Sequence, residues 1–286
     1  MRTRVLLLAC ALGISAGFGF PNGARQTTEP PGAAASSPSD IPHGPALVDA
    51  QRLFYNARYD AAAAAALELR AADPEDLATY ELRTSALLFQ IKSTLADAPD
   101  MNDAFKRCAP CQPVMAAFLS DVARGRALAR ARLAADPHDE DALFFLGKVD
   151  LNYVWMQLGT LGRKTGWNEY REARRSLQAV LKRNPRHVRA RVAYAWIEYI
   201  VDTKVPFGVK WLLGGGDRKR ALRTVQEAAA ADTDFFSHTE AVFGLWELQV
   251  RQKMVREAVG TARLIARDFP DNAEVAKFLG THAAVP

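Results

Sequence analysis

The sequence predicts an all-α fold made of about five helix hairpins with irregular insertions between some of them. One observation is a sequence motif that recurs along the chain, in which a small residue is followed twelve positions later by proline. Another is that alanine-rich stretches carry apolar residues at helical spacing, while no stretch alternates as a strand would. With 286 residues, 49% of them apolar, the chain is long enough to bury a sizeable core.

The first residues have the pattern of an export signal. Arg2 and Arg4 give a positive start, and the uncharged apolar run 5–20 follows. That run is short for a membrane span, so we expect residues 1–24 to be a cleaved signal peptide. Two alternatives stay open: an uncleaved membrane anchor, and a lipoprotein signal ending at Cys10. The expected location is therefore the periplasm or another exported site.

Composition divides the rest of the chain. Residues 25–44 are rich in proline, serine and alanine, which predicts a disordered linker. The helical domain is expected over 45–280, and 281–286 should form a flexible tail. The net charge is +5 and becomes +3 without Arg2 and Arg4. Such a mild charge gives little support for nucleic-acid binding, and we expect membrane contact only through an uncleaved leader.

The recurring motif is clearest between Ala173 and Pro185. It returns from Ala62 to Pro74 and from Ala258 to Pro270, more weakly from Gly125 to Pro137, and in degenerate form from Ala221 to Thr233. A small residue lets a second helix approach closely, and the residue before proline disfavours helical geometry. Proline suits the start of the next helix. We therefore expect leading helices at about 46–57, 75–95, 138–158, 186–203 and 234–251.

These motifs resemble the repeat motif of the tetratricopeptide repeat (TPR) family, in which the second helix begins Tyr-x-x-Ala and the unit ends in proline. The match is good at 170–185 and 255–270 and moderate at 59–74. Successive units end 63, 48, 48 and 37 residues apart, whereas regular TPR units repeat every ~34. The resemblance implies a superhelical stack whose concave groove, lined by first helices, binds a protein or peptide. An ordinary helical bundle is the alternative.

Cys108-Ala-Pro-Cys111 is the one segment with reactive chemistry. A Cys-x-x-Cys pair at a helix start can exchange disulfides when a thiol has a lowered pKa. No strand precedes it, as one would in thioredoxin-like enzymes. A structural disulfide is the expected interpretation, and a redox pair is the alternative. A zinc site would need two further ligands, and we expect no metal or other cofactor.

Two irregular segments and two leading helices supply the candidate partner contacts. The segments hold Lys164, Trp167, Lys210 and Trp211, and aromatic and cationic side chains are common binding anchors. The helices mix polar and aromatic residues, some of which could face the groove, although Tyr153, Trp155 and Trp196 could instead be interhelical core. Those residues are Asn152, Tyr153, Trp155, Gln157, Tyr194, Trp196, Glu198, Tyr199 and Asp202, with Trp155, Tyr194 and Trp196 as the preferred candidates.

The glycine run 214–216 precedes Asp217 and a predicted helix. Free backbone N–H groups at a helix start can hold an anion, but the expected interpretation is a turn in which Asp217 caps the helix. Three clusters of cations could form a strip that recognises acidic peptide ends, or could simply be solvated helix faces. They are Arg171, Arg174 and Arg175; Arg186 and Arg189; and Arg218, Lys219, Arg220 and Arg223.

The sequence contains none of the common hydrolase, zinc-protease or dinucleotide-binding signatures. The predicted function is an extracytoplasmic, TPR-like adaptor that binds a protein or peptide and is not an enzyme. Two other classes stay open. One is a thiol-disulfide helper using Cys108 and Cys111. The other is a small-ligand accessory protein for transport, which predicts an enclosed pocket near Trp155, Trp196 and Trp211.

Overall fold

The computed structural model describes residues 44–95, 98–205 and 214–282, where every regular element is helical. This confirms the all-α prediction. The predicted leader, the linker up to residue 43, and both Lys210 and Trp211 lie outside the described residues. Of the helices in the described part, none is both long and apolar enough to cross a membrane.

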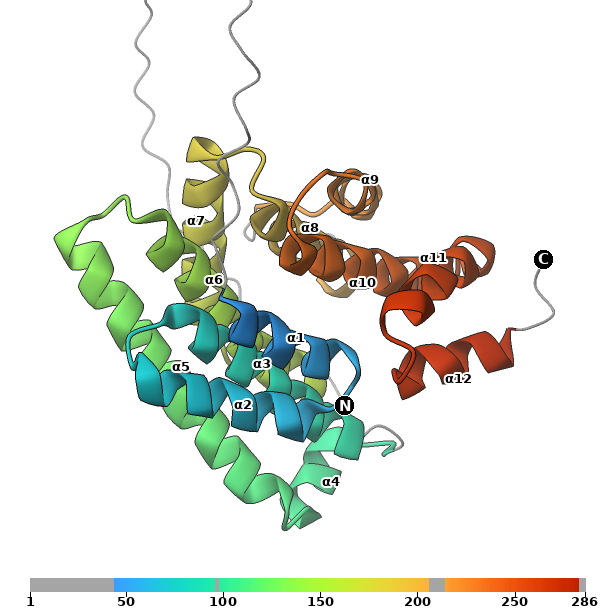
Figure 1. Cartoon of the computed structure of the whole chain (residues 1–286), viewed down its shortest axis with the longest axis horizontal. Helices are drawn as coiled ribbons and strands as arrows, with labels where there is room; N and C mark the ends of the chain where they lie inside the picture. Colours follow the sequence, from blue (N-terminus) through green and yellow to red (C-terminus); the bar gives the residue numbers. More distant parts are fainter. Residues whose placement is uncertain (1–43, 96–97, 206–213, 283–286) are drawn as a thin grey trace, which may run out of the picture. The chain divides into compact units, whose positions relative to one another are not determined.

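Ten helices of the described residues pair into five successive hairpins, which confirms the predicted number (Figure 1). The leading helices have nearly the predicted bounds. The pairs are α1 (Pro45–Tyr55) with α2 (Tyr59–Ala72), α3 (Leu77–Thr94) with α5 (Cys111–Ala135), α6 (Glu140–Val154) with α7 (Trp167–Arg183), α8 (Val188–Lys204) with α9 (Arg218–Ala229), and α10 (Phe235–Arg251) with α11 (Val255–Asp268).

The turns between hairpins differ in one respect from the expectation. Pro74, Pro137 and Pro185 each lie three residues before the next helix begins, not at its first position. A cap residue stands between. Asp76 accepts a hydrogen bond from the N–H of Ala78 at 2.9 Å, as Asp139 does from Ala142. The proline therefore ends one helix, and a separate side chain starts the next.

His187 fills the capping position of α8 in the same way. The backbone N–H of Ala190 donates to its Nδ1 at 3.3 Å, and its ring lies 4.6 Å from that of Phe144. Burial lowers the pKa of His187 to about 4, and the nearby Arg189 charge adds to this effect. The neutral ring therefore serves as an acceptor at neutral pH.

The small residues of the recurring motif lie where helices contact one another. Ala62, Ala173, Ala221 and Ala258 are completely buried. A Cβ placed on Gly125 would lie 3.2 Å from the Cβ of Tyr80, so α5 and α3 approach closely there. The spacing seen in the sequence thus reflects where second helices pack against first helices.

Three elements lie outside the five hairpins. The short helix α4 (Met101–Arg107) lies between α3 and α5, and the π-helical segment η1 (Trp155–Thr160) extends α6. Both occur in the insertions that lengthen the repeat spacing. The final helix α12 (Ala273–Thr281) follows the last hairpin and was not among the expected elements.

The first hairpin contacts the last one. The ring of Tyr55, at the end of α1, lies 4.6 Å from that of Phe243 in α10. Asn272, which caps α12, donates a side-chain hydrogen bond to the backbone oxygen of Tyr55 at 2.7 Å. The Tyr59 hydroxyl donates to Glu274 at 3.2 Å. The two hydrogen bonds join residues 217 and 215 positions apart, and a simple open stack of hairpins would not predict these contacts.

Candidate functional site

Four charged side chains from four leading helices meet in the interior. Glu81 of α3, Lys148 of α6, Arg189 of α8 and Glu240 of α10 form what we call the central charge network. Arg189 donates from Nε to Glu240 at 2.6 Å and from Nη2 to Glu81 at 2.9 Å. Lys148 contacts both carboxylates. Each cation therefore bridges two acids, and the four helices are joined.

The network is largely buried, and Arg189 and Glu240 keep their charges within it. The side chains of Arg189 and Glu81 are only 3% and 5% exposed. Burial opposes the charge on Glu240, but Lys148 and Arg189 outweigh it and lower the pKa of this carboxyl. For Arg189, burial lowers the pKa, while Glu240 and Glu81 raise it by more. Buried charges with this many partners are costly to separate.

Neighbouring polar residues of the leading helices are also inside. Asn152, Gln157 and Tyr199 are each less than 9% exposed. The Asn152 amide donates to the hydroxyls of Thr84 at 2.9 Å and Ser85 at 3.0 Å. The Asn152 amide thus joins α6 to α3 inside the fold and is not presented to solvent.

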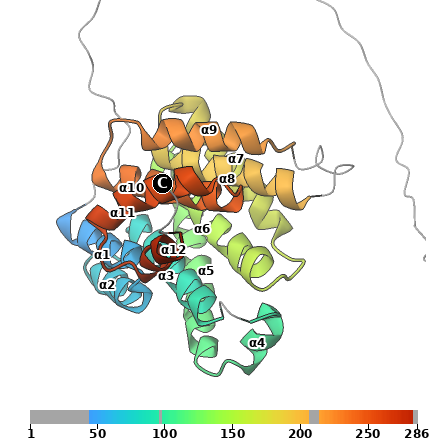
Figure 2. The same cartoon turned by 90° about the vertical axis from the view of Figure 1, so that its right-hand side faces the viewer.

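An exposed groove lies instead between the second helices α7 and α9, with α8 as its floor. We call it the α7–α9 groove, and its volume is 260 Å³. Figure 2 shows α7, α8 and α9 next to one another. Its lining combines apolar and charged groups from all three helices. The lining residues are Leu181, Pro185, Arg191, Tyr194, Ala195, Glu198, Arg220 and Thr224.

Hydrogen bonds and ion pairs fix the polar walls of this groove. The Tyr194 hydroxyl accepts from the Gln178 amide at 2.7 Å. Arg220 holds Glu198 at 2.6 Å, and Arg191 holds Glu227 at 2.6 Å. The acids beside the groove are thus already neutralised by cations of the same wall.

Among the described contact candidates, Tyr194 and Glu198 of α8 line this groove. Trp196 lies on another side of α8, 5.5 Å from the Arg251 guanidinium. Trp155 packs against two core clusters. Trp167 and Lys164 are exposed near the start of α7, with Trp167 46% exposed. The structure therefore does not bring these candidates together.

The small-ligand alternative predicted an enclosed pocket near Trp155, Trp196 and Trp211. Trp155 packs against two hydrophobic clusters and Trp196 against two others, and Trp211 lies outside the described residues. A second pocket of 330 Å³ lies beside the start of α1 and contains neither tryptophan. In the part of the chain that is described, no three His, Cys, Asp or Glu side chains are grouped so as to hold a metal ion.

Sequence analysis missed most of the groove. Leu181, Pro185, Arg191 and Thr224 were not candidates, because their convergence depends on how three helices pack. The available signal was the basic cluster that contains Arg220. Arg186 and Arg189 were expected on one face, but Arg186 is exposed whereas Arg189 lies in the central charge network.

The glycine run has a structural role in the described residues 214–216. Asp217 accepts hydrogen bonds from the N–H groups of Lys219 and Arg220, both at 2.9 Å, so it caps α9 as expected. A Cβ on Gly216 would lie 2.4 Å from the backbone nitrogen of Asp202. Glycine is needed there because the turn passes against the backbone of α8.

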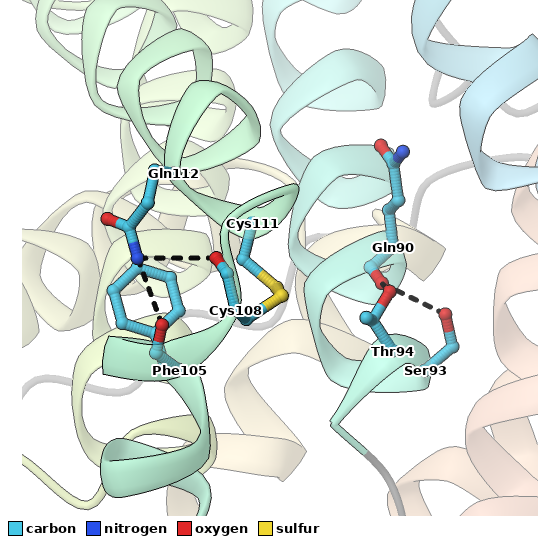
Figure 3. The surroundings of a disulfide bond; sticks show 7 residues. All are labelled: Gln90, Ser93, Thr94, Phe105, Cys108, Cys111 and Gln112. Carbon is cyan, nitrogen blue, oxygen red and sulfur yellow. Dashed lines mark hydrogen bonds between the residues drawn. A yellow bond between two sulfur atoms is a disulfide. The ribbon is translucent and has the colours of Figure 1, made fainter.

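Cys108 and Cys111 are joined, with their sulfur atoms 1.98 Å apart (Figure 3). Cys111 begins α5 and is 2% exposed, whereas Cys108 is partly exposed. The Gln112 amide donates to the backbone oxygen of Phe105 at 2.9 Å and so ties the end of α4 to α5 (Figure 3). Whether the pair is structural or redox-active stays a prediction.

A second buried acid lies away from the groove. Asp150 of α6 is completely buried and contacts Arg126 of α5. Burial raises the pKa of Asp150 to about 8; the Arg126 charge opposes this effect, while Glu172 of α7 adds to it. Glu172 in turn pairs with Arg130 at 2.5 Å. At neutral pH Asp150 is therefore mostly protonated.

Comparisons with known proteins give little beyond the fold. No protein-family model matches the chain, and no curated protein matches it. Among solved structures, the chain is similar to a thermophilic TPR protein of Thermus thermophilus, with 16% identity and a TM-score of 0.45. The alignment covers 82% of this chain and 96% of that one. At this level of likeness it carries no information about a ligand or partner.

Proposed function

We propose that this chain is an exported helical-hairpin scaffold that binds a protein or peptide. The observation that carries the proposal is the α7–α9 groove, which is formed by the second helices of successive hairpins and has both apolar and charged walls. Such mixed surfaces suit polypeptide segments, because apolar side chains supply burial and polar groups fix register. A scaffold, not a catalyst, is the function that this surface supports best.

Export is the part of the proposal that rests on the sequence alone. The positive start and apolar run within residues 1–24 support it. N-terminal sequencing of the protein isolated from envelope and periplasmic fractions tests it. A mature end within 17–24 is expected. An intact Met1 in the membrane fraction would favour the anchor, and an acylated Cys10 would favour the lipoprotein.

Partner binding is tested by affinity purification of the tagged chain from its native envelope, followed by mass spectrometry. Thr224→Trp fills the groove with a large side chain. Leu264→Trp is the matched control, because Leu264 is 52% exposed on α11. A near-stoichiometric protein retained by the parent chain and the control, but lost from Thr224→Trp, is expected. If no retained protein depends on Thr224, the proposal fails.

A second candidate function is thiol–disulfide exchange, which the joined pair Cys108–Cys111 favours. A thiolate of a dithiol substrate would attack the sulfur of the more exposed Cys108, which forms a mixed disulfide and releases Cys111 as a thiolate; the second substrate thiol would then displace Cys108, so the substrate is oxidised and the pair is reduced. Replacing both residues by serine separates the two functions. Oxidation of a dithiol peptide by the parent chain but not by the serine variant, with partner binding retained, would favour exchange, whereas no oxidation by the parent chain would leave the pair a structural one.

A further inference from the structure

The positive charge of this chain is concentrated in the segment that contains α7, α8 and α9. Residues 167–229 contain 14 Lys and Arg against 6 Asp and Glu, a net of +8. Residues 44–166 contain 14 against 16, and residues 230–286 contain 6 against 8, so each has a net of −2. The mild overall charge thus hides one strongly basic region between two slightly acidic ones.

On α7 the cations lie along the edge of the groove. Gln178 and Leu181 face α8, as their contacts show. Arg171, Arg175 and Lys182 are four and seven residues apart, which places them on one stripe of the helix next to that face, and all three are exposed. The α7 edge therefore presents a row of positive charge to solvent.

On α9 the same arrangement recurs. Arg220 and Thr224 line the groove, while Ala221 and Val225 are buried against the core. Lys219 and Arg223, four residues apart, stand on the outward side of the groove-lining face and are exposed. Two basic rims thus flank one partly apolar groove.

The nearby acids do not neutralise these rims. Glu198 and Glu227 are paired with Arg220 and Arg191, and Asp217 caps α9. Glu172 turns to Arg130 of α5. Within the described residues, Arg175, Lys182, Lys219 and Arg223 have no ion-pair partner. Their charges are available to a ligand.

We propose that the α7–α9 groove binds an acidic polypeptide segment, with carboxylates over the two basic rims and an apolar side chain between Leu181, Pro185 and Tyr194. This inference rests on the proposed scaffold function and names its ligand class. Guanidinium groups match carboxylates in geometry, and the groove volume of 260 Å³ accommodates a side chain. A lipid surface fits less well, because the large exposed apolar residues of the described chain lie mostly on other helices.

The test uses the full exported chain and a fluorescent peptide of glutamate and leucine, with fluorescence anisotropy as the readout. Arg175→Glu/Arg223→Glu reverses one charge on each rim. Arg256→Glu/Arg263→Glu is the matched control, since both residues are exposed on α11 and the net charge changes equally. We expect the rim variant to weaken binding at least about tenfold and the control less than about twofold. Added salt should weaken the parent interaction.

Several results would overturn the inference. One is no binding of the acidic peptide, and another is equal weakening by both double variants. Stronger binding to phosphatidylglycerol vesicles or to a DNA duplex than to the peptide would assign the rims to phosphate ligands. If a native partner is lost from Thr224→Trp but retained by Arg175→Glu/Arg223→Glu, the scaffold function stands and the acidic ligand is excluded.

Discussion

Arg189 and Arg191 are two residues apart on α8, yet they lie in different environments. Arg189 points into the central charge network and its side chain is 3% exposed. Arg191 lines the α7–α9 groove, pairs with Glu227, and is 22% exposed. Both arginines form salt bridges, so the two differ mainly in how far their side chains are exposed to water. Buried charge here joins four helices, whereas charge at the groove is exposed to a ligand.

Removing the buried arginine should have the largest effect on stability. Arg189→Met leaves Glu81 and Glu240 with Lys148 alone, and breaking such a buried group costs about 3–5 kcal/mol. Arg191→Met, on the same helix, should cost less than about 1 kcal/mol, because exposed ion pairs contribute little. Chemical denaturation of both variants measures the contrast. Equal losses would show that the central charge network does not hold the leading helices together.

The second expected effect concerns pH and the buried Asp150. Its pKa is raised to about 8 from 3.8, so between these values the native state holds a proton that the unfolded chain releases. Stability should therefore fall as pH rises from 4 to 8. Asp150→Asn keeps a neutral side chain and should remove part of this fall, on the order of 2 kcal/mol.

Thermal unfolding of the parent chain and Asp150→Asn across this range gives the comparison. Asp121, a buried acid of α5 that pairs with Arg70 and Arg83, supplies a matched control in Asp121→Asn. That substitution should lower stability and leave the fall between pH 4 and 8 in place. An unchanged pH profile in Asp150→Asn would show that this carboxyl is ionised in the folded chain.

The disulfide should contribute less. Cys108 and Cys111 are only three residues apart, and so small a loop removes little freedom from the unfolded chain. We expect Cys108→Ser/Cys111→Ser to lose about 2 kcal/mol or less in a denaturation experiment. A larger loss in the free energy of unfolding would mean that α4 and the start of α5 depend on the disulfide for their packing. That outcome would favour a structural role for the pair.

The smallest stability effect is expected at the groove rims. Lys182→Glu and Arg223→Glu change exposed residues without ion-pair partners in the described chain, so each should stay within about 0.5 kcal/mol of the parent. Their effect belongs to binding. A large loss of stability from either would show that the rims serve the fold and not a ligand.

The sequence by itself determined the helices and their hairpin order. The small-residue positions and the Asp-Pro or Asn-Pro turns are local signals, because helix propensity, capping and proline geometry act within a few residues. Such signals located α3, α8 and α10 to within about two residues. They also showed the basic clusters, which are visible without any knowledge of packing.

Only the tertiary structure decided what those helices do together. Glu81, Lys148, Arg189 and Glu240 are far apart in the sequence, and nothing local indicates that they meet. The convergence of α7, α8 and α9 on one groove, and the contact of Tyr55 with Phe243, depend equally on packing. The side of α8 on which an arginine lies decides whether it stabilises the core or faces solvent, because burial changes the strength of its charge interactions.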